Sequence, residues 1–136
     1  MARYLADTNI VLFSLFNPKE LEREVTDLLK DYNNRLYIST ASVQEIIYMY
    51  KRNKIKTRWK NAEEILPNIE RNFEILPVKK EHLVTYSKLS ISNEHNDPVD
   101  HVIISQAITE RITLISSDQK FEYYIPQKLD FIFNSR

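Results

Sequence analysis

The sequence predicts an α/β fold in which a mostly parallel sheet carries helices on both faces. Short apolar segments alternate with helical patterns almost throughout the 136 residues, which is typical of repeated strand–helix–strand units. Acidic residues follow two of the apolar segments, in "LADTN" and "ISSDQ". The chain length and the hydrophobic fraction of 43% match one domain with a real core. We therefore expect residues 1–136 to form a single domain.

The spacing of apolar residues places the individual elements. Strands are expected at residues 2–6, 35–40, 73–78, 112–117 and 129–134. Helices are expected at residues 19–32, 41–54, 57–70, 80–89 and 96–111, and a further one begins near Thr8. We expect the 57–70 helix to break near Pro67, because proline lacks a backbone N–H group. Asp97 followed by Pro98 is a strong helix start, with a capping residue before proline at the first helical position.

The composition excludes several classes of protein. Glycine is absent, so the chain has no P-loop, dinucleotide fingerprint, nucleophile elbow or EF-hand loop, which all need glycine at fixed positions. Cysteine is also absent, which excludes disulfides, thiolate zinc sites and cysteine nucleophiles. No apolar run approaches the roughly 18 residues of a membrane span. We expect a soluble, cytoplasmic protein.

Basic residues are concentrated in one segment of an otherwise acidic chain. The formal net charge is zero, with 19 basic and 19 acidic residues. The basic segment, residues 51–60 ("KRNKIKTRWK"), contains six lysine or arginine residues and no acid. The remainder of the chain is therefore net acidic, and the basic segment is a candidate surface for a polyanion.

Five acidic residues each have a structural explanation of their own. Asp7, Asp97 and Asp118 each precede a candidate helix, where an N-cap side chain accepts a hydrogen bond from the first turn. Asp100 lies three residues after Asp97 and can complete a capping box. Glu45 is harder to explain, because it lies among apolar residues in "ASVQEIIYMY". A buried carboxylate needs a partner, and its own helix face offers no lysine or arginine.

Taken together, four of these residues predict a metal site. Ligands of parallel sheets bind beyond the carboxyl ends of the strands, where the acidic quartet of Asp7, Glu45, Asp100 and Asp118 can converge. Carboxylates in one cleft repel each other unless a cation lies between them, and oxygen ligands suit Mg²⁺ or Mn²⁺. Open coordination positions for water and a phosphate give the layout of metal-assisted phosphodiester hydrolysis.

Four segments resemble, in order and spacing, the motifs of the PIN-domain family, in particular the toxin ribonucleases called VapC. They are "LADTNI", "STASVQEI", "HNDPVDHVIISQA" and "LISSDQKF", and the resemblance covers about residues 4–133. It implies a PIN-like α/β/α sandwich and a Mg²⁺- or Mn²⁺-dependent endoribonuclease that leaves 5′-phosphate and 3′-hydroxyl ends. It also implies a homodimer and a small antitoxin that holds the toxin inactive.

The resemblance assigns metal binding and catalysis to the acidic quartet. It places four more polar residues beside the metal, where they would orient carboxylates or water: Thr8, Asn9, Asp97 and Ser116. For Asp97, a role as a helix cap stays open. Many relatives have arginine directly after the residue matching Asp100, whereas this chain has His101. A neutral imidazole cannot supply the charge or the paired contacts of arginine, so His101 is either a substitute of different chemistry or a plain surface residue.

The basic segment has two interpretations. A run of cations is usually a solvated face, but this one adjoins the helix that carries Glu45, and an RNA backbone could lie on it with Trp59 stacking on a base. The candidate RNA-binding residues are Lys51, Arg52, Lys54, Lys56, Arg58 and Trp59. Contact with an antitoxin or a second copy is the main alternative for Trp59. We expect four tyrosines to be packing residues: Tyr48, Tyr50, Tyr123 and Tyr124.

The function expected from these observations is metal-dependent hydrolysis of RNA, as the toxin of a toxin–antitoxin pair. Transfer, ribosomal and messenger RNA are all open as substrates. One rival is a PIN-like module that binds RNA or a protein without cleaving. Another is a receiver domain of the response-regulator type, which would need paired acids after the first strand, where "ADTN" has one. Metal-dependent cleavage of RNA distinguishes the first reading from both rivals.

Overall fold

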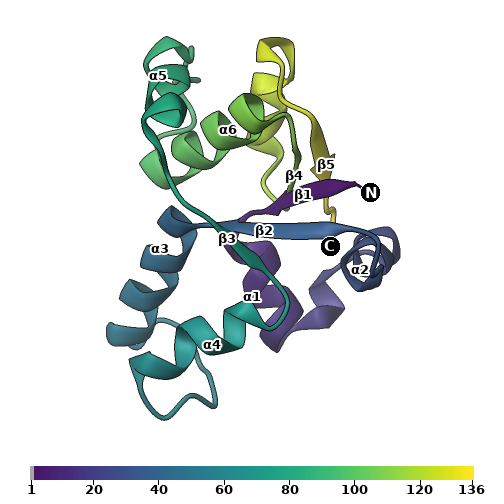
Figure 1. The fold of residues 1–136 in the computed structure, drawn as a ribbon, viewed down its shortest axis with the longest axis vertical. Coiled ribbons are helices and arrows are strands. Elements are labelled where there is room, and N and C mark those ends of the chain that lie inside the picture. Colours follow the sequence, from purple (N-terminus) through teal and green to yellow (C-terminus); the bar gives the residue numbers. More distant parts are fainter. Residues whose placement is uncertain (1) are drawn as a thin grey trace.

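A five-stranded parallel sheet forms the centre of the molecule (Figure 1). The computed structural model describes residues 2–136. The strands are β1 (Arg3–Ala6), β2 (Arg35–Ser39), β3 (Glu74–Leu76), β4 (Thr113–Ser116) and β5 (Phe131–Phe133). Their order in the sheet is β3-β2-β1-β4-β5, and each neighbouring pair is parallel. The predicted α/β class with a mostly parallel sheet is confirmed.

Helices cover both faces of this sheet, so the fold is an α/β/α sandwich. The α-helices are α1 (Thr8–Phe16), α2 (Arg23–Lys30), α3 (Thr40–Lys51), α4 (Ile65–Glu70), α5 (Lys80–Lys88) and α6 (Pro98–Glu110). Three 3₁₀ segments join them: η1 (Pro18–Glu20), η2 (Ala62–Glu64) and η3 (Gln119–Gln127). In Figure 1, α1 to α4 lie below the sheet, and α5, α6 and the yellow η3 segment lie above it.

The alternation of side chains along the strands divides the core into two halves. Leu5 and Leu114 point to the face covered by α6 and η3, where they pack with Ile103 and Tyr124. The next residue of β1, Ala6, belongs to the opposite cluster with the side chains of α1 and α3. Because both faces of a parallel sheet are covered, its strands are apolar on both sides. These short apolar runs are the feature from which the sequence predicts the strands.

Two of the predicted helices are shorter than expected. The helix expected at 19–32 is divided into η1 and α2, with residues 21 and 22 between them. Most of the N-terminal half of the helix expected at 57–70 is an irregular loop, followed by η2 and α4. The break expected near Pro67 is wrong, because Pro67 is the third residue of α4. The first residues of a helix have no intrahelical acceptor for their N–H groups, so proline costs little there.

The sheet order creates a topological switch point at its centre. The chain moves outward from β1 through β2 to β3, then returns to place β4 on the other side of β1. Crevices at such points, beyond the carboxyl ends of the strands, are where open α/β sheets bind ligands. The chain from β2 leads directly into α3, because Ser39 ends the strand and Thr40 begins the helix (Figure 1). Among residues 2–136, every helix falls short of the length and apolarity that crossing a membrane requires.

Candidate metal centre

An acidic cavity lies at the switch point between β1 and β4. Its volume is about 210 Å³. The residues that line it are Asp7, Thr8, Asn9, Glu45, Met49, Asp97, Asp100 and Asp118. The sequence-predicted acidic quartet therefore converges in space, from positions more than 100 residues apart in the chain. Three of the predicted neighbours, Thr8, Asn9 and Asp97, lie in the same lining, and their roles stay predictions.

Asp7 is both a helix cap and a wall of the cavity. It follows β1, and its Oδ1 accepts a 2.7 Å hydrogen bond from the backbone N–H of Thr8, which starts α1. Its Oδ2 accepts a second hydrogen bond of 2.7 Å from the hydroxyl of Ser116. A carboxylate has about four acceptor positions, so each oxygen retains a lone pair. Asp7 is therefore a helix cap, as one explanation predicts, and its carboxylate also keeps lone pairs that could bind a cation.

Ser116 connects Asp7 to Asp118 through one hydroxyl. The Ser116 Oγ accepts a 3.0 Å hydrogen bond from the backbone N–H of Asp118 while it donates to Asp7. Asp118 in turn caps η3, because its Oδ1 accepts from the backbone N–H of Lys120 at 2.9 Å. Asp97 is likewise the N-cap of α6, and its Oδ1 accepts from Val99 N–H at 2.9 Å. These contacts fix the backbone from which the acidic side chains project.

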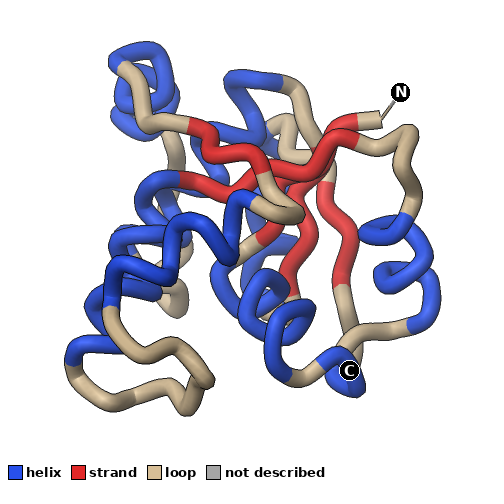
Figure 2. Tube along the Cα trace, turned by 60° about the horizontal axis from the view of Figure 1, so that its bottom comes forward, coloured by secondary structure: helices blue, strands red, loops and turns tan. Residues whose placement is uncertain are grey.

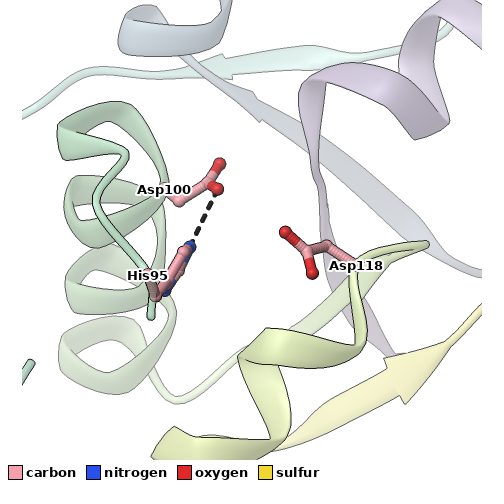
Figure 3. A group of neighbouring side chains, drawn as sticks. All are labelled: His95, Asp100 and Asp118. Carbon is pink, nitrogen blue, oxygen red and sulfur yellow. Dashed lines mark hydrogen bonds and ion pairs between the residues drawn. The ribbon is translucent and has the colours of Figure 1, made fainter. Parts of the chain in front are cut away.

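Asp100 is oriented by a histidine and not by a capping box. Its Oδ2 lies 2.9 Å from Nε2 of His95, which belongs to the loop before α6 (Figure 3). The His95 ring is buried, at 2% exposure, and its Nδ1 lies 3.0 Å from the hydroxyl of Tyr124. Figure 3 shows the Asp118 carboxylate on the opposite side of the cavity, pointing toward Asp100. Ligand atoms of His95, Asp100 and Asp118 all lie within 4.8 Å of one another.

Glu45 reaches the cavity from the second turn of α3. It is half-buried, and burial raises the pKa of its carboxyl above the usual range. The hydroxyl of Thr8 opposes that rise and the charge of Asp97 adds to it. Thr8 is 4% exposed, and among residues 2–136 its Oγ1 makes no hydrogen bond of regular geometry. This buried hydroxyl thus lies near the Glu45 carboxyl without a well-formed hydrogen bond to it.

Burial and mutual repulsion make two of the carboxyls hard to ionise. Burial, together with the charge of Asp100, raises the pKa of Asp7 to about 7, although the hydrogen bonds from Ser116 and Thr8 act in the opposite direction. Burial and the charges of Asp97 and Asp118 raise the pKa of Asp100 to about 7 as well. Burial also lowers the pKa of His95 below its usual range, which favours the neutral ring. A bound cation would relieve this repulsion.

The groups present suit a hard divalent cation. The lining offers carboxylate oxygens from four separate elements and the buried Thr8 hydroxyl. Mg²⁺ and Mn²⁺ prefer oxygen ligands and retain positions for water or phosphate. Because the cavity is open and mostly polar, it can admit a charged substrate. The acidic quartet therefore fits the predicted cation.

The basic segment begins at the last residue of α3 and continues along the loop that follows, and its cations are exposed. These are Lys51, Arg52, Lys54, Lys56, Arg58 and Lys60. Trp59 is different, because its ring packs against Phe16 at 5.0 Å and Tyr50 at 6.1 Å between ring centroids. The Trp59 ring is therefore half-buried against these neighbours, and its stacking on a base stays a prediction. Figure 2 shows this loop projecting away from the sheet.

The tyrosines divide between the core and the surface. Tyr124 is buried, and Tyr50 packs on Trp59, as expected for packing residues. Tyr123 is 42% exposed, but its ring packs on that of Tyr124 with centroids 5.1 Å apart. Tyr48 is 56% exposed, so the prediction that it is a packing residue is wrong. Tyr48 is one residue before Met49, which lines the cavity, and the Lys54 ammonium lies 5.7 Å from its ring centroid.

Two histidines, His95 and His101, have positions at the site that the sequence does not predict. His101 is 4% exposed, so the alternative that it is a plain surface residue is wrong. Its Nε2 lies 2.8 Å from the carbonyl oxygen of His95, so the ring faces the loop and not a substrate phosphate. His95 was not recognised as part of the site, because its segment "SNEHND" has the composition of a turn. The available signal was its position five residues before Asp100.

The chain belongs to the PIN domain family, whose model matches residues 4–124. Three solved structures show how closely the fold agrees. The VapBC2 structure from Rickettsia felis, bound to a promoter DNA fragment, contains a chain that is 22% identical, with 97% of this chain and 98% of that chain covered and a TM-score of 0.71. A chain of VapBC-1 from nontypeable Haemophilus influenzae is 21% identical, with 98% of this chain and 99% of that chain covered and a TM-score of 0.67. A chain of DNA-bound VapBC from Salmonella typhimurium is 20% identical, with 98% of each chain covered and a TM-score of 0.69. No curated protein sequence matches significantly.

Proposed function

We propose that this chain is a metal-dependent endoribonuclease and the toxin of a toxin–antitoxin pair, carried by a single domain over residues 1–136. The convergence of Asp7, Glu45, Asp100 and Asp118 on one open cavity supports the catalytic part. Membership of the PIN domain family and the fold shared with VapBC complexes support the toxin part. The partners that follow are an RNA substrate, a small antitoxin and a second copy of the chain in a homodimer. A cytoplasmic location fits this function.

The acidic quartet would hold one or two Mg²⁺ or Mn²⁺ ions. When bound, such an ion lowers the pKa of a coordinated water and stabilises charge on the phosphate. The water oxygen forms a bond to phosphorus while the bond to the 3′ oxygen breaks, and a proton finally goes to that leaving oxygen. The products are a 5′-phosphate and a 3′-hydroxyl. No serine, cysteine or histidine nucleophile is needed for these steps.

The protein contributes rigid placement of the ligands. Ser116 and the Thr8 N–H fix both oxygens of Asp7, and the α6 and η3 caps fix the backbone beside Asp100 and Asp118. Asn9 is exposed and lines the cavity, where it would contact water or a phosphate oxygen. Groups held in advance act on the transition state without further reorganisation. The exposed lysines and arginines of the basic segment would contact the RNA backbone.

Glu45 offers the cleanest test of this proposal, because it caps no helix. We expect Glu45→Gln to keep a native circular-dichroism spectrum and lose RNA cleavage. Metal catalysis supplies several kcal/mol, so the rate should fall by about 100-fold or more. Glu24→Gln, an exposed change on α2, is the matched control.

The assay compares wild type and both variants on structured and unstructured RNA in Mg²⁺, in Mn²⁺ and in EDTA. The proposal predicts cleavage by wild type and Glu24→Gln with either metal and none in EDTA. If cleavage by wild type continues in EDTA, or if Glu45→Gln cleaves as fast as wild type, the metal mechanism is wrong. If wild type binds RNA but leaves it intact under every condition, the chain is a non-cleaving module.

A further inference from the structure

His95 occupies a site that the proposed chemistry leaves without a role. It is 2% exposed, and its two ring nitrogens face different groups. Nε2 lies 2.9 Å from Oδ2 of Asp100, and Nδ1 lies 3.0 Å from the hydroxyl of Tyr124. A buried neutral imidazole has one donor and one acceptor nitrogen. The question is which nitrogen carries the proton.

The partners determine the tautomer. When a cation is bound, Asp100 must be ionised and can only accept, so Nε2 must carry the hydrogen and donate to it. Nδ1 is then an acceptor, and the Tyr124 hydroxyl donates to it. The Tyr124 oxygen itself accepts from the backbone N–H of Ser92 at 3.3 Å. A directed chain of hydrogen bonds therefore runs from Ser92 through Tyr124 and His95 to Asp100.

The His95 ring is held in place by its surroundings. It packs edge-on against His101, with ring centroids 4.9 Å apart, and against Phe121 at 5.3 Å. The His101 Nε2 lies 2.8 Å from the backbone carbonyl of His95, and because a carbonyl can only accept, His101 must donate. Both the ring and the backbone of His95 are therefore fixed before any ligand arrives.

We propose that His95 is a positioning residue, which donates from Nε2 to Oδ2 of Asp100 and leaves the other carboxylate oxygen free for a divalent cation. Tyr124 fixes the tautomer, and His101 fixes the loop that carries the ring. This inference rests on the proposed metal site of the acidic quartet. Partners of this kind orient a metal-binding group and typically change metal affinity by about 10- to 100-fold.

Two amide substitutions separate positioning from packing. Glutamine places its Nε2 donor near the Nε2 of histidine and its Oε1 acceptor toward Tyr124, whereas asparagine is too short to reach Asp100. We expect His95→Gln to bind Mn²⁺ within a few-fold of wild type. His95→Asn should bind about 10- to 100-fold more weakly, with circular dichroism confirming that both are folded. Equal affinity of His95→Asn and wild type would overturn the proposal.

Tyr124→Phe supplies a second, independent variant, because it retains the ring and removes the hydroxyl. If Tyr124 acts through His95, the loss of Mn²⁺ affinity caused by Tyr124→Phe disappears in the His95→Asn background. Independent roles would instead make the two losses additive. Additive losses would overturn the relay from Tyr124, and a coupled loss would support it.

The alternative that His95 itself coordinates the cation is tested by spectroscopy. A histidine ligand gives a ¹⁴N coupling in the pulsed electron paramagnetic resonance spectrum of bound Mn²⁺, and a positioning histidine does not. We expect no such coupling in wild type, and a coupling that vanishes in His95→Gln would overturn the proposal. Nitrogen NMR of the protein with diamagnetic Mg²⁺ bound, where Asp100 must be ionised, should show the Nε2–H tautomer for His95. Neither readout needs RNA cleavage, so a failure here is distinguishable from a failure of the ribonuclease proposal.

Discussion

The hydroxyl of Ser116 donates a 2.7 Å hydrogen bond to Oδ2 of Asp7, 109 positions earlier in the chain. The same oxygen accepts the backbone N–H of Asp118. One small side chain at the end of β4 therefore fixes the relative positions of two members of the acidic quartet. It also favours the ionised form of Asp7 against burial, which is the largest influence on the pKa of that group.

Ser116→Ala should weaken metal binding most at low pH. Without the donated hydrogen bond the pKa of Asp7 rises further, and metal ligands must be deprotonated to bind. We expect the pH midpoint of Mn²⁺ binding to move upward. Stability should fall by about 1–3 kcal/mol, because the Asp7 Oδ2 acceptor and the Asp118 N–H donor each lose their partner. Calorimetric titrations between pH 6 and 8 measure the midpoint. Ser87→Ala on the exposed face of α5 is the control, and an unmoved midpoint in Ser116→Ala would contradict this role.

Asp7→Asn separates the two roles of Asp7. Asparagine caps helices about as well as aspartate, so the fold should survive, while a neutral amide cannot replace a carboxylate as a metal ligand. We expect a native circular-dichroism spectrum and near-complete loss of RNA cleavage. The matched control is Asp27→Asn, an exposed change on α2. An active Asp7→Asn preparation, free of wild-type protein, would mean that Asp7 is only a cap.

The raised pKa values of Asp7 and Asp100 predict an unusual pH dependence of stability in EDTA. Their carboxyls titrate near pH 7 in the folded protein against 3.8 as the reference. Between about pH 4 and 7 the folded state therefore holds protons that the unfolded state has released. Under this condition the free energy of unfolding falls as the pH rises. The melting temperature of metal-free wild type should be lower at pH 8 than at pH 5.

Asp7→Asn should show a smaller decline over the same range, because the amide stays neutral at every pH. Each pKa unit corresponds to about 1.4 kcal/mol, and 1 kcal/mol shifts the melting temperature by roughly 3–5 °C at this chain length. The difference between the variants is therefore measurable by calorimetry. Parallel declines in wild type, Asp7→Asn and Asp27→Asn would show that Asp7 does not titrate in this window.

The basic segment predicts the salt dependence of RNA binding. Each phosphate contact adds about 0.7–0.9 to the slope of log affinity against log salt. Replacing four of its exposed cations by glutamine should weaken binding and flatten that slope: Lys51, Arg52, Lys54 and Lys56. The control replaces four exposed cations elsewhere: Lys19, Arg23, Lys80 and Lys88. Equal slopes for both sets would mean that the basic segment faces solvent or a protein partner.

The acidic quartet can be predicted from the sequence because the carboxyl ends of parallel strands meet at one edge of the sheet. Apolar runs mark the strands, and Asp7 and Asp118 follow two of them directly, so their meeting at one sheet edge needs only topology. His95 lies outside this logic. Its contact with Asp100 depends on the path of the irregular loop before α6, which periodicity does not specify. The second hydrogen bond of Ser116 also depends on side-chain geometry and not on residue type.

Helix lengths were overestimated where local pattern and packing disagree. Apart from Trp59, residues 57–61 carry polar or charged side chains. The chain there is held by Tyr50 packing on Trp59 and by the Tyr50 hydroxyl donating to the Trp59 carbonyl. These long-range contacts hold an irregular path that sequence periodicity cannot anticipate. In α4, Pro67 fits because it lies in the first turn.

Melting curves in EDTA and in millimolar Mn²⁺, at one ionic strength, test the central claim most directly. A cation that binds only the folded state at a hundred times its dissociation constant stabilises it by about 2.7 kcal/mol, which raises the melting temperature by several degrees. We expect wild type and Asp27→Asn to show this rise. Asp118→Asn, which keeps its helix cap, should be no less stable than wild type in EDTA and should respond less to Mn²⁺. If wild type melts at the same temperature with and without Mn²⁺, and no metal restores cleavage of any RNA, the acidic quartet is a set of helix caps and surface acids and not a metal centre.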